Sequence, residues 1–146
     1  MLAEVCPSAF DDSLLTAITW MANGIRERDL ARKYLSFFIA LEALFIRDNK
    51  ATRAADGYQN PIVPIGEGVG WLLGGSGDAR RQIAEQIEWL GRTRNKIVHR
   101  GFTMIDEADL IQLGSYLWNS CWQAATKRAS FRVEDSFQDW LRDQKP

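Results

Sequence analysis

The sequence has little cysteine and little histidine. Its 146 residues include two cysteines, Cys6 and Cys121, and one histidine, His99. Two distant thiols are too few for a disulfide framework, and they suit a reducing cytoplasm. One histidine and two distant cysteines do not make a ligand set for a metal. We therefore expect a cytoplasmic protein that uses no metal and no other cofactor.

Long hydrophobic runs are also missing. The longest apolar stretch covers residues 35–46 and is interrupted by Glu42. It falls short of the roughly 18–20 apolar residues that a helix needs to cross a bilayer. The first residues contain no basic region followed by an apolar stretch, so the sequence predicts no signal peptide. We expect no association with membranes.

The chain has almost no net charge, with a formal value of −1. This balance excludes a protein that coats nucleic acid through bulk electrostatics, so any such role needs a local basic patch. One patch exists, because Arg92, Arg94, Lys96 and Arg100 fall within nine residues that contain no acid. The alternative interpretation is a solvated helix end, where cations are favoured by the helix dipole.

Helical periodicity dominates what is present. Apolar residues recur at three- and four-residue steps, and no long stretch alternates with a period of two. We expect helices at residues 13–28, 29–47, 66–73, 78–98, 106–130 and 131–142. Residues 11–13, Asp29 and Asp106 are the expected N-caps, and Gly101 is an expected left-handed C-cap. Residues 48–64 read as an irregular loop and residues 74–77 as a glycine-rich turn.

These elements predict an all-α, up-and-down bundle of four to six helices. A hydrophobic fraction of 46% and a charged fraction of 25% fit one globular domain over residues 1–146, with its core at about residues 13–130. The expected inner stripe of the first helix is Leu14, Leu15, Ile18, Met21 and Ile25. The stripe of the 106–130 helix is Leu110, Leu113, Leu117, Cys121 and Ala124.

Arg94 breaks the pattern of the 78–98 helix. At 100° per residue, the apolar side chains on either side of it fall within about 80° of arc, and Arg94 lies in the middle. They are Ile83, Ile87, Leu90 and Ile97. An arginine there is costly to desolvate unless it is paired or opens onto a cleft or subunit boundary. The alternative is a side chain whose stem packs while its head reaches water.

His99 follows Arg94 by five residues, which on a straight helix turns it about 140° away. Arg92 and Asn95 would instead share its face. If Arg94 and His99 cooperate within one chain, the helix must bend or end between them, and Gly101 is consistent with an ending. Otherwise the two groups must meet across a symmetric dimer.

The run Arg94-Asn95-Lys96-Ile97-Val98-His99 resembles the signature of HEPN domains, in which an arginine and a polar residue precede a histidine. Four residues separate Arg94 from His99 and six separate Arg92 from it, and both gaps occur in the family. The stretches 89–101 and 37–45, the second with its Ala-Leu-Glu run, look like the Apea-like branch of these domains. The resemblance covers about residues 13–130.

The resemblance implies a helical homodimer with two Arg/His motifs in one cleft. Many members are metal-independent endoribonucleases of toxin, abortive-infection or CRISPR-associated systems. It implies acid–base work by His99 and phosphate stabilisation by Arg94. Asn95 would orient the pair or bind substrate, and Glu42 either orients Arg94 or His99 or forms a structural ion pair. The further candidates for RNA-backbone contacts are Arg92, Lys96 and Arg100.

Trp118 and Trp122 give the expected homodimer separate support. They lie one turn apart on a helix whose inner stripe is already supplied, and aromatic residues beyond the core are enriched at interfaces. A wide buried face is the alternative. Two other functions stay open. The chain can be a non-catalytic binding module or regulatory partner of a nucleotidyltransferase-type antitoxin, or it can be the C-terminal sensor or scaffold part of a longer defence protein.

Overall fold

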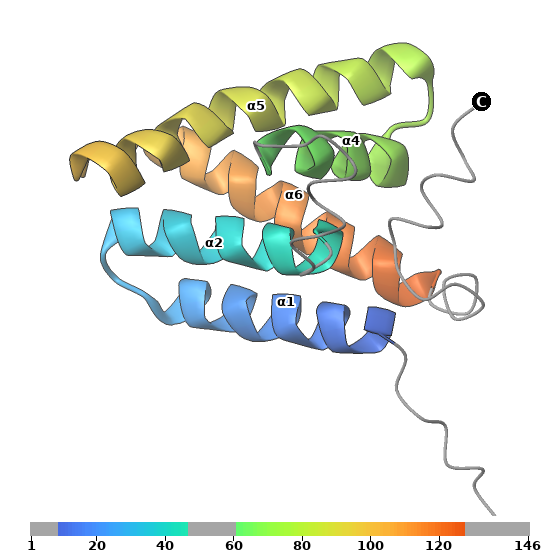
Figure 1. Ribbon diagram of the computed structural model, residues 1–146, viewed down its shortest axis with the longest axis horizontal. Helices are drawn as coiled ribbons and strands as arrows, with labels where there is room; N and C mark the ends of the chain where they lie inside the picture. Colours follow the sequence, from blue (N-terminus) through green and yellow to red (C-terminus); the bar gives the residue numbers. More distant parts are fainter. Residues whose placement is uncertain (1–8, 47–60, 128–146) are drawn as a thin grey trace, which may run out of the picture.

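The computed structural model describes residues 9–46 and 61–127, which form a bundle of five α-helices (Figure 1). In chain order these are α1 (Ala9–Arg26), α2 (Leu30–Phe45), α4 (Ile62–Leu73), α5 (Gly77–Arg100) and α6 (Glu107–Thr126). The described ranges contain no strand. The predicted all-helical class is therefore confirmed for these residues. The expected helix at 131–142 and most of the expected loop at 48–64 lie outside them.

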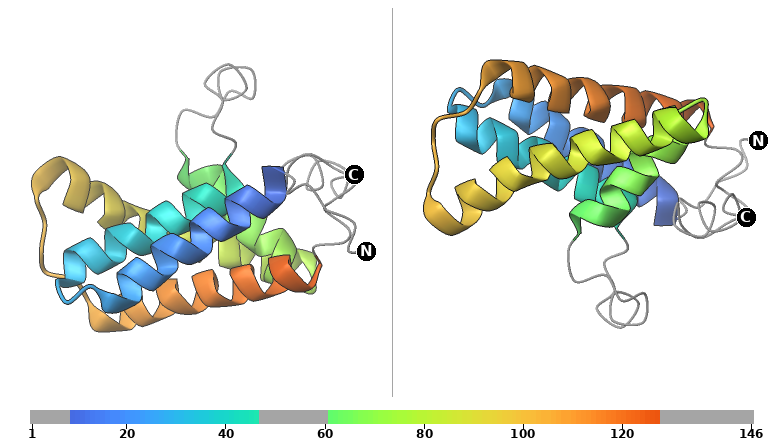
Figure 2. Two further views of the ribbon diagram at one scale, coloured as in Figure 1. Left: turned by 90° about the horizontal axis from the view of Figure 1, so that it is seen from below. Right: turned by 90° about the horizontal axis from the view of Figure 1, so that it is seen from above.

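The helices form two pairs with α6 between them. Helices α1 and α2 lie side by side, α4 lies against α5, and α6 contacts members of both pairs. Figures 1 and 2 show α5 along the outer side of the bundle, opposite α1. One side of α5 therefore packs inward, while no other described helix covers its other side.

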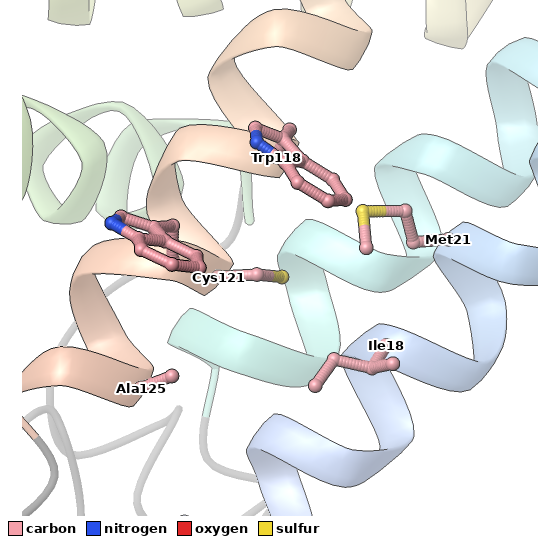
Figure 3. A pocket seen from close by; sticks show the side chains of 6 residues that line it. Ile18, Met21, Trp118, Cys121 and Ala125 are labelled. Atoms are coloured by element: carbon pink, nitrogen blue, oxygen red, sulfur yellow. The ribbon is translucent and has the colours of Figure 1, made fainter.

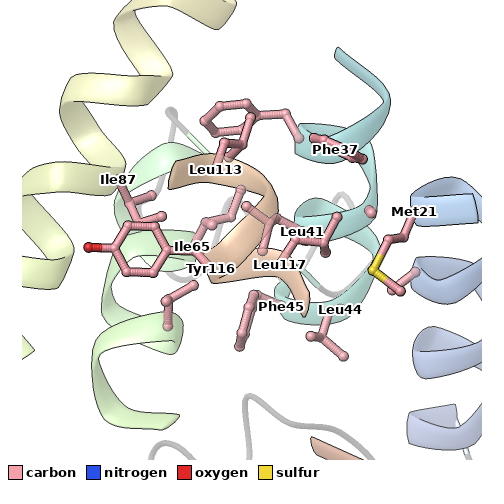
Figure 4. Close-up of a cluster of buried hydrophobic side chains, with 14 of the residues drawn as sticks. Met21, Phe37, Leu41, Leu44, Phe45, Ile65, Ile87, Leu113, Tyr116 and Leu117 are labelled. Carbon is pink, nitrogen blue, oxygen red and sulfur yellow. The ribbon is translucent and has the colours of Figure 1, made fainter. Parts of the chain in front are cut away.

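The core lies where α2, α4 and α6 meet (Figure 4). Tyr34 and Phe38 of α2 are almost fully buried, as are Leu113 and Leu117 of α6. Asp29 and Asp106 cap α2 and α6 by accepting hydrogen bonds from backbone N–H groups within the first turn. The predicted caps of these two helices and the predicted inner stripe of α6 are confirmed.

Helix α1 differs from its prediction. It begins at Ala9, so the expected caps at residues 11–13 lie inside its first turns. Leu15, Ile18 and Ile25 are 64%, 39% and 59% exposed, whereas the buried residues are Phe10, Leu14, Ala17 and Met21. The apolar residues of α1 form one wide arc of about 160° at 100° per residue, and α2 and α6 cover only part of it. The buried face is the one whose small residues permit close approach, as Ala17 does.

Helix α4 begins at Ile62, four residues before its predicted start. Proline suggested irregular structure up to Pro64, but Pro64 lies in the first turn of the helix. Proline is tolerated there because the N–H that it lacks would have no partner within the helix. The boundary prediction was wrong for that reason.

Glycines bring the backbones of α4 and α5 together. A Cβ atom at Gly70 would lie 2.8 Å from the carbonyl oxygen of Arg80, and one at Gly66 would lie 3.1 Å from that of Ala84. On the other helix, Gly91 faces the side chain of Ile62. Helix α4 thus packs closely against α5 between Arg80 and Gly91.

Helix α5 runs without interruption from Gly77 to Arg100. Its N-cap is Ser76, and Asp78, the predicted first residue, lies in the first turn and pairs with Arg81 at 2.6 Å. Gly101 ends the helix with a φ of 65°, which confirms the predicted left-handed C-cap. The helix therefore does not end between Arg94 and His99, as cooperation of these residues within one chain would require.

Candidate nucleic-acid interface on helix α5

Arg94 lies on the inner side of α5, where the sequence predicts it. Leu90 and Ile97 beside it are buried. The Arg94 guanidinium donates a hydrogen bond to Glu42 Oε1 of α2 at 3.3 Å and another to Asn95 Oδ1 at 3.1 Å. The Arg94 and Glu42 side chains remain 24% and 26% exposed. Arg94 is therefore both paired and in reach of solvent, and Glu42 pairs with it rather than with His99.

His99 lies on the outer side of the same helix, in its last turn. His99 is exposed, and its side chain has no hydrogen-bond or ion-pair partner among the described residues. Because α5 is uninterrupted, five residues of helix turn His99 about 140° from Arg94. The structure therefore does not bring these two candidate residues together within one protomer.

The three other predicted basic residues share the outer side with His99. Arg92, Lys96 and Arg100 are exposed and lie at helical steps that place them on one strip. Gly101 lets the backbone N–H of Phe102 reach the Lys96 carbonyl oxygen, and Lys96 Nζ lies 5.7 Å from the centre of the Phe102 ring. The helix dipole favours cations at this end, so the strip is stable whether or not it binds an anion.

Asn95 lies between the two sides of α5. It helps to line a cavity of about 180 Å³ between α4 and α5, together with Ile62, Val63, Glu88 and Arg92. Its amide oxygen is held by Arg94, which leaves the amide N–H₂ as a donor. A cavity of this size is smaller than the usual pocket for a drug-sized ligand. Its polar lining combines the Glu88 carboxylate with the Arg92 guanidinium and the Asn95 amide.

Trp89 is a candidate that the sequence patterns did not single out. It is 58% exposed, and the Arg92 guanidinium carbon lies 5.8 Å from the centre of its ring. The available signal was its position three residues before Arg92, outside the apolar arc of the helix. An aromatic side chain at that step from a cation on a solvent-facing strip is typical of nucleic-acid contacts.

The predicted tryptophans Trp118 and Trp122 lie on another surface. They are 55% and 60% exposed, so the prediction that they lie beyond the core stripe is confirmed. They border an apolar groove of about 240 Å³ between α1 and α6, with Ile18, Met21, Cys121 and Ala125 (Figure 3). Burial raises the pKa of the Cys121 thiol to about 11, which keeps the groove uncharged.

Residues 9–46 and 61–127 contain no group of three or more side chains of the kinds that ligate metals. None of their helices is both long and apolar enough to cross a membrane.

No protein-family model, curated protein or solved structure matches the chain. The resemblance to HEPN domains therefore rests on the residues of the motif and their helical setting.

Proposed function

We propose that the protein is a metal-independent endoribonuclease of the HEPN type that acts as a homodimer. The observation that carries the proposal is the ordered Arg94 guanidinium, held by Glu42 and Asn95 and still partly exposed. Such a group binds a phosphate oxygen at little cost in entropy and stabilises charge that develops there. It lies on the same helix as an exposed histidine with no other described partner.

The proposed reaction needs only protein groups and RNA. One His99 imidazole accepts the proton of a ribose 2′-OH, and the 2′-oxygen attacks the neighbouring phosphorus. The bond from phosphorus to the 5′-oxygen breaks, and a protonated imidazole returns a proton to that oxygen. The products are a 2′,3′-cyclic phosphate and a free 5′-OH. Arg94 stabilises the charge on the phosphoryl oxygens.

The angle between the two residues supports the homodimer in this proposal. A straight helix separates Arg94 and His99 by about 140°, so each Arg94 needs the histidine of a second copy. In a two-fold dimer the same surface patch of both copies meets at the axis, which places two motifs in one cleft. We propose that Arg94 of one protomer works with His99 of the partner subunit.

A second candidate is a non-catalytic RNA-binding module. The observation that favours it is the Arg94–Glu42 ion pair, which gives Arg94 a structural role without any substrate. This module would keep the exposed basic strip and need no second copy. The regulatory-partner function fits the same observation.

The test is the chemistry of the product. Purified protein is incubated with mixed RNA in the presence of EDTA, and the new ends are analysed. We expect 2′,3′-cyclic phosphate and 5′-OH ends, and no cleavage of DNA of the same sequence, because DNA lacks the attacking hydroxyl. Intact RNA after incubation at high protein concentration would contradict the nuclease and favour the binding module.

A further inference from the structure

The outer side of α5 carries an aromatic residue within its basic strip. Trp89 is 58% exposed although it stands on a helix that buries Ile87 and Leu90 on its other side. At 100° per residue, Trp89 falls in one arc of about 100° with the strip of Arg92, Lys96, His99 and Arg100. Exposing a large aromatic side chain forfeits favourable burial, so its position suits contact with a ligand.

The charges around Trp89 are asymmetric. Glu85 and Glu88 precede it on the helix, whereas Arg92 and Lys96 follow it. The Arg92 guanidinium, 5.8 Å from the ring centre, is close enough to contact a phosphate next to a base that lies on the ring. A polyanion is therefore attracted toward the C-terminal end of α5 and repelled from the residues before Trp89.

We propose that Trp89 is a base-stacking residue for single-stranded RNA, whose phosphates follow Arg92, Lys96 and Arg100 toward His99. Stacking requires a base with a free face, which single strands offer and a paired A-form duplex does not. The inference rests on the proposed function only for the choice of RNA as the ligand. It adds a residue that binds the substrate at a distance from the reacting atoms.

The distance along the helix sets the length of strand involved. Ten residues separate Trp89 from His99, which is about 15 Å of α-helix. A stacked strand rises about 3.4 Å per nucleotide, so the base on Trp89 lies about four nucleotides or fewer from the phosphodiester near His99. Oligonucleotides too short to span this distance should bind wild-type protein and Trp89→Ala with the same affinity.

The experiment measures binding without cleavage. The probe is a short single-stranded RNA of mixed sequence with 2′-O-methyl riboses, which have no free hydroxyl to attack. We expect Trp89→Ala to weaken its binding by about 5- to 150-fold, the usual effect of losing one base–aromatic stack. Trp89→Phe should lose much less. The matched control is Trp20→Ala, which removes an exposed tryptophan from α1 and should leave binding unchanged.

Fluorescence supplies a second readout. The chain has six tryptophans, and a base stacked on an indole quenches its emission. Quenching on binding should disappear in Trp89→Phe and persist in Trp20→Phe. Binding that is unchanged in Trp89→Ala would overturn the inference, as would a wild-type protein that binds no single strand or binds the duplex form of the probe equally well.

The inference and the nuclease fail in different ways. Weaker binding by Trp89→Ala, together with wild-type protein that leaves RNA intact, would support stacking and contradict catalysis. Cleavage by wild-type protein, with Trp89→Ala binding normally, would support catalysis and overturn stacking.

Discussion

The two sides of helix α5 place similar polar residues in different surroundings. On the inner side, Arg94 is paired with Glu42 and Asn95 and is only 24% exposed. On the outer side, Arg92 and His99 face solvent without a described ion pair. Two residues of one sequence motif can therefore be close in the chain while their side chains point to opposite sides of a helix. In the proposed homodimer, the fixed arginine of one subunit and the accessible histidine of the other form one site.

The largest effect should come from the outer side. We expect His99→Ala to slow RNA cleavage by about 10²–10⁴-fold, the range for a lost general acid or base, without changing the free energy of unfolding. Arg94→Ala should also slow cleavage, but it should lower stability because it leaves the Glu42 carboxylate partly buried without its partner. Single-turnover cleavage and chemical unfolding of both variants check this. Equal loss of stability in the two variants would remove the distinction between the sides.

The next prediction concerns the close contact by which α4 holds the inner side of α5. Gly70→Ala should destabilise the fold by about 1–3 kcal/mol, as overpacking does, because the new Cβ atom would meet the Arg80 carbonyl oxygen at 2.8 Å. The control is Gly75→Ala, whose Cβ atom would meet nothing within 4 Å. Thermal or denaturant unfolding measures both. A stable Gly70→Ala protein would show that α4 does not fix α5.

A smaller effect should follow from Glu42→Gln. The Arg94–Glu42 pair is about three-quarters buried, so we expect a loss of about 1 kcal/mol in the free energy of unfolding. Glu85→Gln on the outer side, a residue with no ion pair among the described residues, should leave stability unchanged. Equilibrium unfolding in urea compares the two variants. Identical midpoints would mean that the pair orders Arg94 without stabilising the fold.

The smallest effect depends on pH. The Tyr34 hydroxyl donates a hydrogen bond to the Leu90 carbonyl oxygen at 2.7 Å, and burial raises the pKa of Tyr34 above its usual value. Tyr34→Phe should cost about 1 kcal/mol near neutral pH. Above pH of about 10 the unfolded protein ionises this phenol but the folded protein does not. Wild-type stability should then fall, and the difference between the two proteins should shrink. A constant difference from pH 7 to pH 11 would contradict this.

Much of the fold followed from sequence, and the reasons differ between helices. The stripe of α6 is regular, so periodicity placed its buried residues correctly, and Asp29, Asp106 and Gly101 marked real helix ends. Helix α1 has a wide apolar arc, and sequence alone does not say which part of it other helices will cover. The start of α4 was missed because proline in a first turn looks like proline in a loop.

The candidate site was predictable in part. The apolar arc of α5 located Arg94 and showed that it needed a partner, and Glu42 is that partner. The angle between Arg94 and His99 depends on where the helix ends, and the Gly101 cap alone left this open. Trp89 was missed because exposure is a property of the packed molecule, and the identity of the residue does not reveal it.

The most direct test of a site shared between two subunits is complementation between two inactive variants. Arg94→Ala and His99→Ala proteins, each checked for folding by circular dichroism, are mixed under conditions that let subunits exchange, and RNA cleavage is measured. If Arg94 works with His99 of the partner subunit, half of the dimers regain one of two sites, and activity returns to about a quarter of the wild-type value. A mixture as inactive as either variant alone, with exchange verified, would contradict the account.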